Sequence, residues 1–175
     1  MEAHSIAVIG LGAILYSDQG LGLRVVQALQ KQKLPKHVEL IEGGMSGLNL
    51  VPWMDNHKKV IFISAIASGT APGTVRRFLP ADLESLIQSK PEPVSHLGRS
   101  GECEDSQARD DQIPADDERS LLDAIQTAEY LGITPEIIII GVEPESIQPG
   151  LKLTENLAQK IPVIITKVKE EIRNQ

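Results

Sequence analysis

Three short, continuous apolar runs constrain the fold of this chain more than any other feature of its sequence. They span residues 6–9, 60–63 and 137–140, and none of them contains a polar residue. A strand with one face in water alternates apolar and polar residues, whereas a strand buried on both faces does not. The three runs therefore predict strands in the middle of a parallel sheet whose two faces are both covered.

Segments with helical periodicity separate these runs. The expected helices span 21–30, 48–54, 120–131 and 153–172, and Pro162 predicts a kink in the last one or a break into two pieces. Two further strands are expected at 38–41 and, with more exposure, at 75–78. The alternation predicts one α/β domain over residues 1–175, a three-layer α/β/α sandwich around a mostly parallel sheet of about five strands.

Residues 88–119 interrupt this alternation. They contain several prolines and glycines with little apolar periodicity, and residues 90–119 hold nine acidic against four basic residues. We therefore expect an acidic surface loop inserted in the domain. The whole chain has a formal net charge of −7, which argues against binding to nucleic acid or to an anionic membrane surface.

The remaining composition favours a cytoplasmic protein. The N-terminus carries no basic segment followed by an apolar one, and the longest apolar runs are too short to span a membrane. A single cysteine, Cys103, excludes an intramolecular disulfide and any site built from several cysteines.

Ligands of parallel sheets bind beyond the carboxyl ends of the strands, where this sequence has unusual segments. Gly10 and Gly12 directly follow the first strand, as in dinucleotide-binding proteins, but Leu15 stands where that pattern needs its third glycine. We therefore expect a tight turn there rather than a nucleotide cofactor.

Four such segments, in order along the chain, resemble the nickel–iron hydrogenase maturation endopeptidases. Residues 10–22 (GLGAILYSDQGLG) are similar to the family pattern Gly-x-Gly-Asn-x-Leu-x-x-Asp-Glu-Gly-x-Gly. Residues 42–47 (EGGMSG) resemble its Asp-Gly-Gly-Thr-x-Gly turn, 71–74 (APGT) follow the third strand as in the family, and 141–146 (GVEPES) resemble its Gly-[Ile/Val]-x-Pro-x-Ser segment.

The resemblance implies a partner and a site. Members of this family remove a C-terminal extension from the hydrogenase large-subunit precursor after nickel insertion, and a Glu, an Asp and a His at strand ends contact the metal. Those positions correspond here to Gln19, to Ser64, and to either His96 or Asp117, depending on where the acidic loop is inserted. The expected catalytic positions are Asp18, Gln19 and Ser64. The expected metal-binding position is His96 or Asp117.

The glycine-rich turns are the expected substrate-binding elements, through Gly12, Gly43, Gly44 and the adjacent Glu42. An amide and a hydroxyl in place of two carboxylates remove charge that would offset a cation such as nickel. The sequence therefore predicts a divergent maturation endopeptidase with impaired nickel binding. The alternative is a non-catalytic relative that keeps the fold and a protein partner but does not cleave it.

Overall fold

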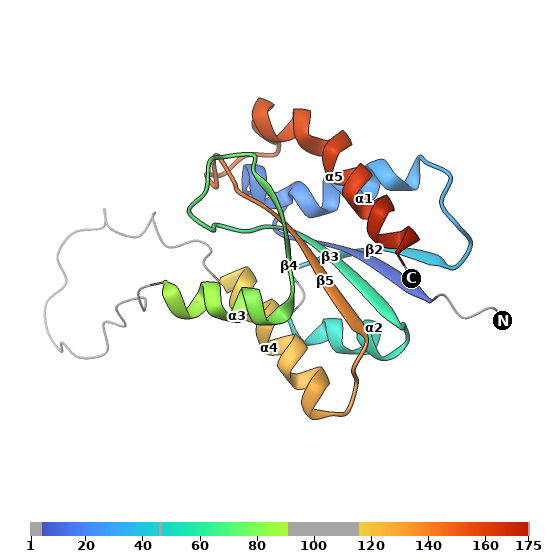
Figure 1. Ribbon diagram of the computed structural model, residues 1–175. Coiled ribbons are helices and arrows are strands. Elements are labelled where there is room, and N and C mark those ends of the chain that lie inside the picture. The colour runs from blue at the N-terminus through green and yellow to red at the C-terminus, as the bar shows by residue number, and fades with distance from the viewer. Residues whose placement is uncertain (1–4, 46, 91–115, 175) are drawn as a thin grey trace, which may run out of the picture.

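The computed structural model describes residues 5–45, 47–90 and 116–174, and it has a five-stranded sheet between two layers of helices (Figure 1). The strand order is β2-β1-β3-β5-β4. Four strands are parallel, namely β1 (Ile6–Leu11), β2 (Val38–Gly44), β3 (Lys59–Ala65) and β5 (Glu136–Val142). The edge strand β4 (Val75–Phe78) runs antiparallel to β5. The expected fold class, a three-layer sandwich with a mostly parallel sheet, is confirmed.

Helices cover both faces of the sheet, which explains the unbroken apolar runs. Helices α1 (Leu21–Gln30) and α5 (Glu155–Arg173) lie on one face. The short 3₁₀ helix η2 (Leu48–Leu50) leads into α2 (Val51–Asp55), which lies on the other face with α3 (Pro80–Ser89) and α4 (Asp116–Tyr130). Each layer has its own apolar core, and all six residues of β1 are buried between the two. No helix within the described residues is long and apolar enough to cross a membrane.

The structure corrects three expectations about helices. The helix α3 was not expected, although Pro80 opens it and the Asp82 carboxylate accepts a hydrogen bond from the Leu79 amide at 2.8 Å. The helix α4 begins at Asp116, four residues earlier than expected, because acidic residues suit the positive end of a helix dipole. The helix α5 continues through Pro162, so the expected break into two pieces is wrong.

The bounds expected for the acidic loop, 88–119, are wrong at both ends. Residues 88–89 end α3 and residues 116–119 begin α4, while 91–115 lie outside the described residues.

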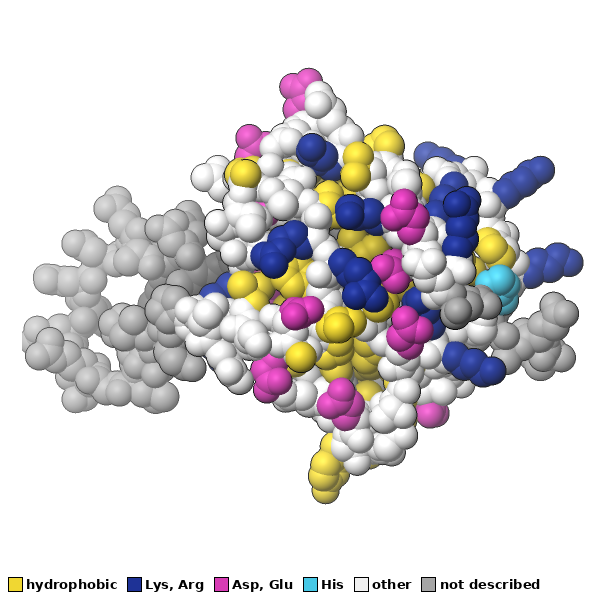
Figure 2. Space-filling model, in the orientation of Figure 1, with side chains coloured by type: hydrophobic (Ala, Val, Ile, Leu, Met, Phe, Trp, Pro, Cys, Tyr) yellow, Lys and Arg dark blue, Asp and Glu magenta, His cyan; other side chains and the backbone are white. Residues whose placement is uncertain are grey.

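Charged side chains occupy the exposed edge strand β4. The Arg76 guanidinium lies 5.0 Å from the centre of the Phe78 ring, and Arg77 Nε donates to Glu171 Oε1 of α5 at 2.6 Å. Figure 2 shows basic and acidic side chains interspersed on the face of the molecule seen in Figure 1. Such charges discourage an open sheet edge from pairing with another chain.

The close packing of α1 on the sheet depends on Gly22. A Cβ atom at this position would lie 2.2 Å from the Ile63 carbonyl oxygen and 2.3 Å from that of Leu11. Both atoms belong to the backbones of β3 and β1, which cannot move aside without disturbing the sheet.

We expect Gly22→Ala to lower the free energy of unfolding by about 1–3 kcal/mol, because the added methyl group forces α1 away from the strands. Chemical denaturation monitored by circular dichroism measures this. Gln88→Ala is the control, because it introduces alanine at an exposed position of the helix α3. Its effect should stay within about 0.5 kcal/mol, and equal losses in the two variants would contradict the packing argument.

Candidate functional site

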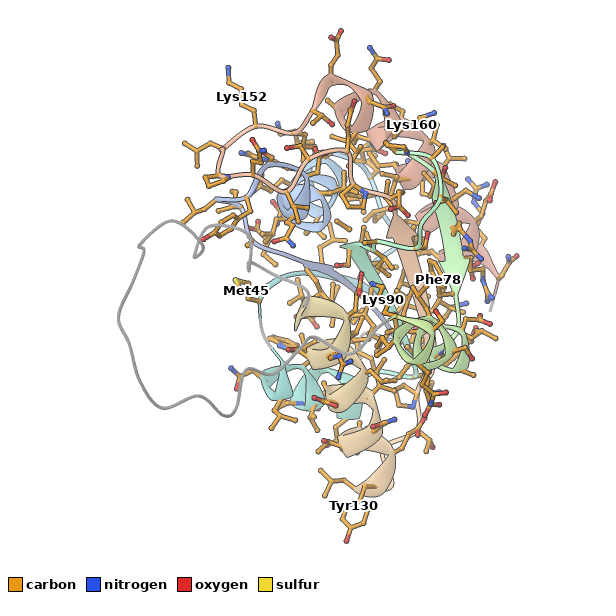
Figure 3. The ribbon with its side chains drawn as sticks, turned by 90° about the vertical axis from the view of Figure 1, so that its left-hand side faces the viewer. Met45, Phe78, Lys90, Tyr130, Lys152 and Lys160 are labelled. Atoms are coloured by element: carbon orange, nitrogen blue, oxygen red, sulfur yellow. The ribbon has the colours of Figure 1, made fainter. Side chains whose placement is uncertain are left out.

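The four unusual sequence segments meet at the edge where the parallel strands end (Figure 3). A hydrogen bond of 2.9 Å from the Gly12 amide to the Gly44 carbonyl joins the first residue after β1 to the last residue of β2. The structure thus brings together two of the expected substrate-binding glycines. Gly12 has a φ of +120°, and a Cβ on it would lie 1.8 Å from the Gln19 carbonyl oxygen, so no other residue fits there.

The other two expected substrate-binding residues belong to the end of β2. A Cβ atom on Gly43 would come within 2.8 Å of the Ile9 side chain, so this glycine packs closely against β1. The Glu42 side chain is exposed and accepts hydrogen bonds from the α1 side chains of Gln27 and Gln30, at 3.4 and 3.3 Å. Glu42 therefore points toward α1.

Asp18 lies in the 3₁₀ helix η1 (Ser17–Gly20) and is completely buried. Its carboxylate accepts hydrogen bonds from the backbone amides of Glu145, Ser146 and Thr154 at 2.7–3.0 Å, and from the Thr154 hydroxyl. These contacts hold the loop between β5 and α5 against the loop after β1. They account for a structural role, and the catalytic role expected for Asp18 stays a prediction.

The two substituted positions are both buried at this edge. Gln19 is 7 % exposed in η1, and Ser64 is 3 % exposed near the end of β3, which η1 contacts. The Ser64 hydroxyl donates to the Ala65 carbonyl at 3.2 Å. Both side chains offer neutral oxygen atoms, whereas nickel sites combine imidazole with charged ligands.

The two candidates for the expected metal-binding position have side chains outside the described part of the structure. His96 lies outside the described residues, and Asp117 lies in the first turn of α4 with its side chain outside them. Within the described ranges, no three His, Cys, Asp or Glu residues are grouped so that they could hold a metal ion. The impaired nickel binding expected from the sequence therefore stays a prediction.

Two further buried carboxylates lie at the same edge, and sequence reasoning missed both. Glu143 directly follows β5 and accepts hydrogen bonds from the amides and hydroxyls of Ser68 and Thr70, at 2.8–3.2 Å. Burial raises the pKa of Glu143, but the hydrogen bonds from Ser68 and Thr70 outweigh it and hold this pKa below its ordinary value. The only sequence signal was an acidic residue immediately after a buried strand.

Glu118 is the second of these carboxylates, and it lies in the first turns of α4. It accepts a hydrogen bond of 2.9 Å from the Ala67 amide and forms an ion pair with Lys90. The sequence did not indicate a buried role for Glu118, because its position fell within the expected acidic loop.

A shallow hollow at the same edge lies between α4 and the ends of β1 and β2. Met45, labelled in Figure 3, is 62 % exposed at its rim. The hollow is lined mainly by apolar atoms of Leu11, Gly44, Met45, Gly47, Leu50, Ser120 and Leu121.

Comparisons with known proteins agree on one group of relatives. A family model described as hydrogenase maturation protease matches residues 23–91. The hydrogenase 2 maturation protease of Escherichia coli (strain K12) is 30% identical over 171 residues, which cover 96% of this chain and 90% of that protein. The hydrogenase expression/formation protein HupD of Rhodobacter capsulatus is 26% identical over 175 residues, covering 98% of this chain and 73% of its own length.

Solved structures give the same result. The E. coli hydrogenase maturating endopeptidase HybD superposes with a TM-score of 0.77 at 28% identity, covering 97% of this chain and 93% of that one. A HybD from Thermococcus kodakarensis, with a TM-score of 0.68 at 18% identity, shares the fold.

Asp18→Ala should lower the free energy of unfolding by about 3 kcal/mol or more, because it leaves several buried amides without an acceptor. Denaturant titration of the purified chain measures this loss. The matched control is Glu145→Ala, which removes an exposed carboxylate from the loop that Asp18 holds. If Asp18→Ala were as stable as the wild-type chain, this would contradict the structural role of Asp18.

The lowered pKa of Glu143 predicts a pH-dependent contribution to stability. The ionised carboxylate stabilises the fold fully above its ordinary pKa of 4.5, and this contribution is lost as the pH falls through the lower pKa of the folded state. At pH 7, Glu143→Gln should therefore lower the free energy of unfolding by about 1–3 kcal/mol.

The difference from wild type should shrink as the pH falls below 4.5. Denaturation series at several pH values test this, with the exposed Glu145→Gln as the control. A difference that stays constant with pH would show that the hydrogen bonds to Glu143 do not depend on its charge.

Proposed function

Because this chain belongs to the hydrogenase maturation protease family, we propose that it acts in hydrogenase maturation by binding the precursor of a nickel–iron hydrogenase large subunit. Support comes from the 30% identity to the E. coli hydrogenase 2 maturation protease over 96% of this chain, and from the shared fold. The site that we assign to this partner is the edge where β1, β2, β3 and β5 end, because ligands of parallel sheets bind there.

We further propose that nickel-dependent cleavage of that precursor is impaired. The observation that carries this proposal is the burial of Gln19 and Ser64 at the edge, with a neutral amide and a neutral hydroxyl in place of the carboxylates expected from the family. Neutral oxygen atoms compete poorly with the water shell of a divalent cation, so nickel in the precursor gains little by entering this site.

In this proposal the backbone does most of the binding. The loops of Gly12, Gly43 and Gly44 bring the main chain close to the edge, so an extended tail of the precursor can lie against it. Asp18 keeps the neighbouring loop in place through its hydrogen bonds to Glu145 and Ser146.

The second candidate is an active endopeptidase with rebuilt ligands. It is favoured by the start of α4, where Asp117 immediately precedes Glu118, whose carboxylate reaches the Ala67 amide beyond the end of β3. The carboxylate of Asp117, in this first turn of α4, could therefore take the place of the histidine expected from the family.

Incubation with a nickel-loaded precursor separates the two functions. We expect a stable complex by size-exclusion chromatography and no shortening of the precursor by mass spectrometry, because the site lacks charged ligands at positions 19 and 64. Calorimetric titration of the free chain with nickel should show no saturable binding. Shortening of the precursor would establish the endopeptidase instead, and absence of both a complex and shortening would reject both functions.

The control variant restores the ligands expected from the family, through Gln19→Glu, Ser64→Asp and Asp117→His. We expect saturable nickel binding by this variant alone. Equal nickel binding by the wild-type chain would show that other residues form the metal site.

A further inference from the structure

The loop after β3 is held at two consecutive backbone amides by two different carboxylates. The Ala67 amide donates to Glu118 Oε1 at 2.9 Å, and the Ser68 amide donates to Glu143 Oε2 at 2.8 Å. Glu118 comes from α4, whereas Glu143 follows β5. Glu143 also binds Thr70, so the contacts extend along the loop from residue 67 to residue 70.

These contacts fix a segment that has no strand or helix of its own. The amides of Ile66 and Gly73, near the two ends of this loop, donate to backbone carbonyls. The amides of Ala67, Ser68 and Thr70 between them donate to carboxylates instead, and Ala67 and Gly69 are exposed. A carboxylate is a stronger acceptor than a carbonyl group, so it holds such a loop more firmly. Ser64 lies three residues before Ala67, and the same contacts therefore fix how β3 ends.

Lys90 supplies the positive charge for this arrangement. Its ammonium group pairs with Glu118 Oε2, while Oε1 of the same carboxylate holds the Ala67 amide. The Glu118 side chain is only 10 % exposed, and a carboxylate that is nearly buried needs such a counter-charge. Glu118 thus joins three segments, namely the residue after α3, the loop after β3 and the start of α4.

The Lys90 side chain remains partly exposed at the proposed partner-binding edge. The Lys90 side chain is 33 % exposed, and Figure 3 places it at the edge of the sheet that faces the viewer. Within the described residues no three His, Cys, Asp or Glu side chains are grouped to hold a metal ion, and Lys90 is a cation that the chain itself provides at this edge.

We propose that Lys90 and Glu118 form a metal-free clamp that positions the loop after β3 for binding of the precursor, a role that rests on the proposed function. The Glu143 carboxylate completes the clamp at the next amide. Lys90 and Glu118 are positioning residues, because they act on the partner through the loop that they hold.

Hydrogen exchange in the full-length chain tests the clamp without any partner. In Glu118→Gln and in Lys90→Met, the Ala67 amide should exchange about tenfold faster than in wild type, equivalent to ~1.4 kcal/mol. Lys90→Arg keeps the ion pair and should restore slow exchange. Lys152→Met, which removes an exposed lysine labelled in Figure 3, should leave the exchange unchanged.

Two further measurements address the metal and the partner. A chelator or added nickel should not alter the exchange of Ala67 in the wild-type chain. Affinity for the precursor should fall about tenfold in Lys90→Met and in Glu118→Gln, equivalent to ~1.4 kcal/mol. The double variant should lose no more than either single variant, because the two residues act as a unit.

Unchanged exchange of Ala67 in both variants, or faster exchange after chelation, would overturn the clamp. Faster exchange with unchanged affinity would overturn its positioning role. If the wild-type chain does not bind the precursor, the proposed function and the positioning role both fail, and the exchange data still decide whether the metal-free clamp exists.

Discussion

Backbone amides in loops that leave a buried sheet must find acceptors, and in this protein buried carboxylates provide them. Asp18 serves the loop between β5 and α5, while Glu118 and Glu143 serve the loop between β3 and β4. Each of the three acids is 9 % exposed or less. The loops at the carboxyl edge are therefore held by charge-assisted hydrogen bonds, and the shape of the candidate site depends on them.

Because some acidic residues hold loops in this way, the net charge of −7 does not reflect solvated surface residues alone. Much of the excess lies between residues 90 and 119, and it first suggests only a solvated surface segment. Glu118 belongs to that stretch by position, yet it is nearly buried and paired with Lys90. Part of the acidic composition therefore organises the site, and counting charges alone does not separate the two roles.

The apolar pattern predicted the sheet and most helices because burial on both faces leaves a local record in the sequence. It did not indicate α3, which has only a short apolar stripe after a proline. It placed the start of α4 too late, because a run of acidic residues is typical of a solvent-exposed loop. The glycine turns at Gly12 and Gly44 were predictable as site elements, since close backbone approach demands glycine. The partners of Asp18 were not predictable, because they lie 127 to 136 residues away along the chain.

The same physics explains why neutral residues suit positions 19 and 64. Both side chains are buried, at 7 % and 3 % exposure, and a carboxylate there would need a cation or several donors to offset its lost hydration. At this edge Asp18, Glu118 and Glu143 already take up backbone amides of the adjoining loops, and Lys90 is committed to Glu118. Two additional carboxylates would therefore need a cation or donors other than these groups. An amide and a hydroxyl avoid that cost, so Gln19 and Ser64 agree with the proposal that this edge holds its shape without a bound cation.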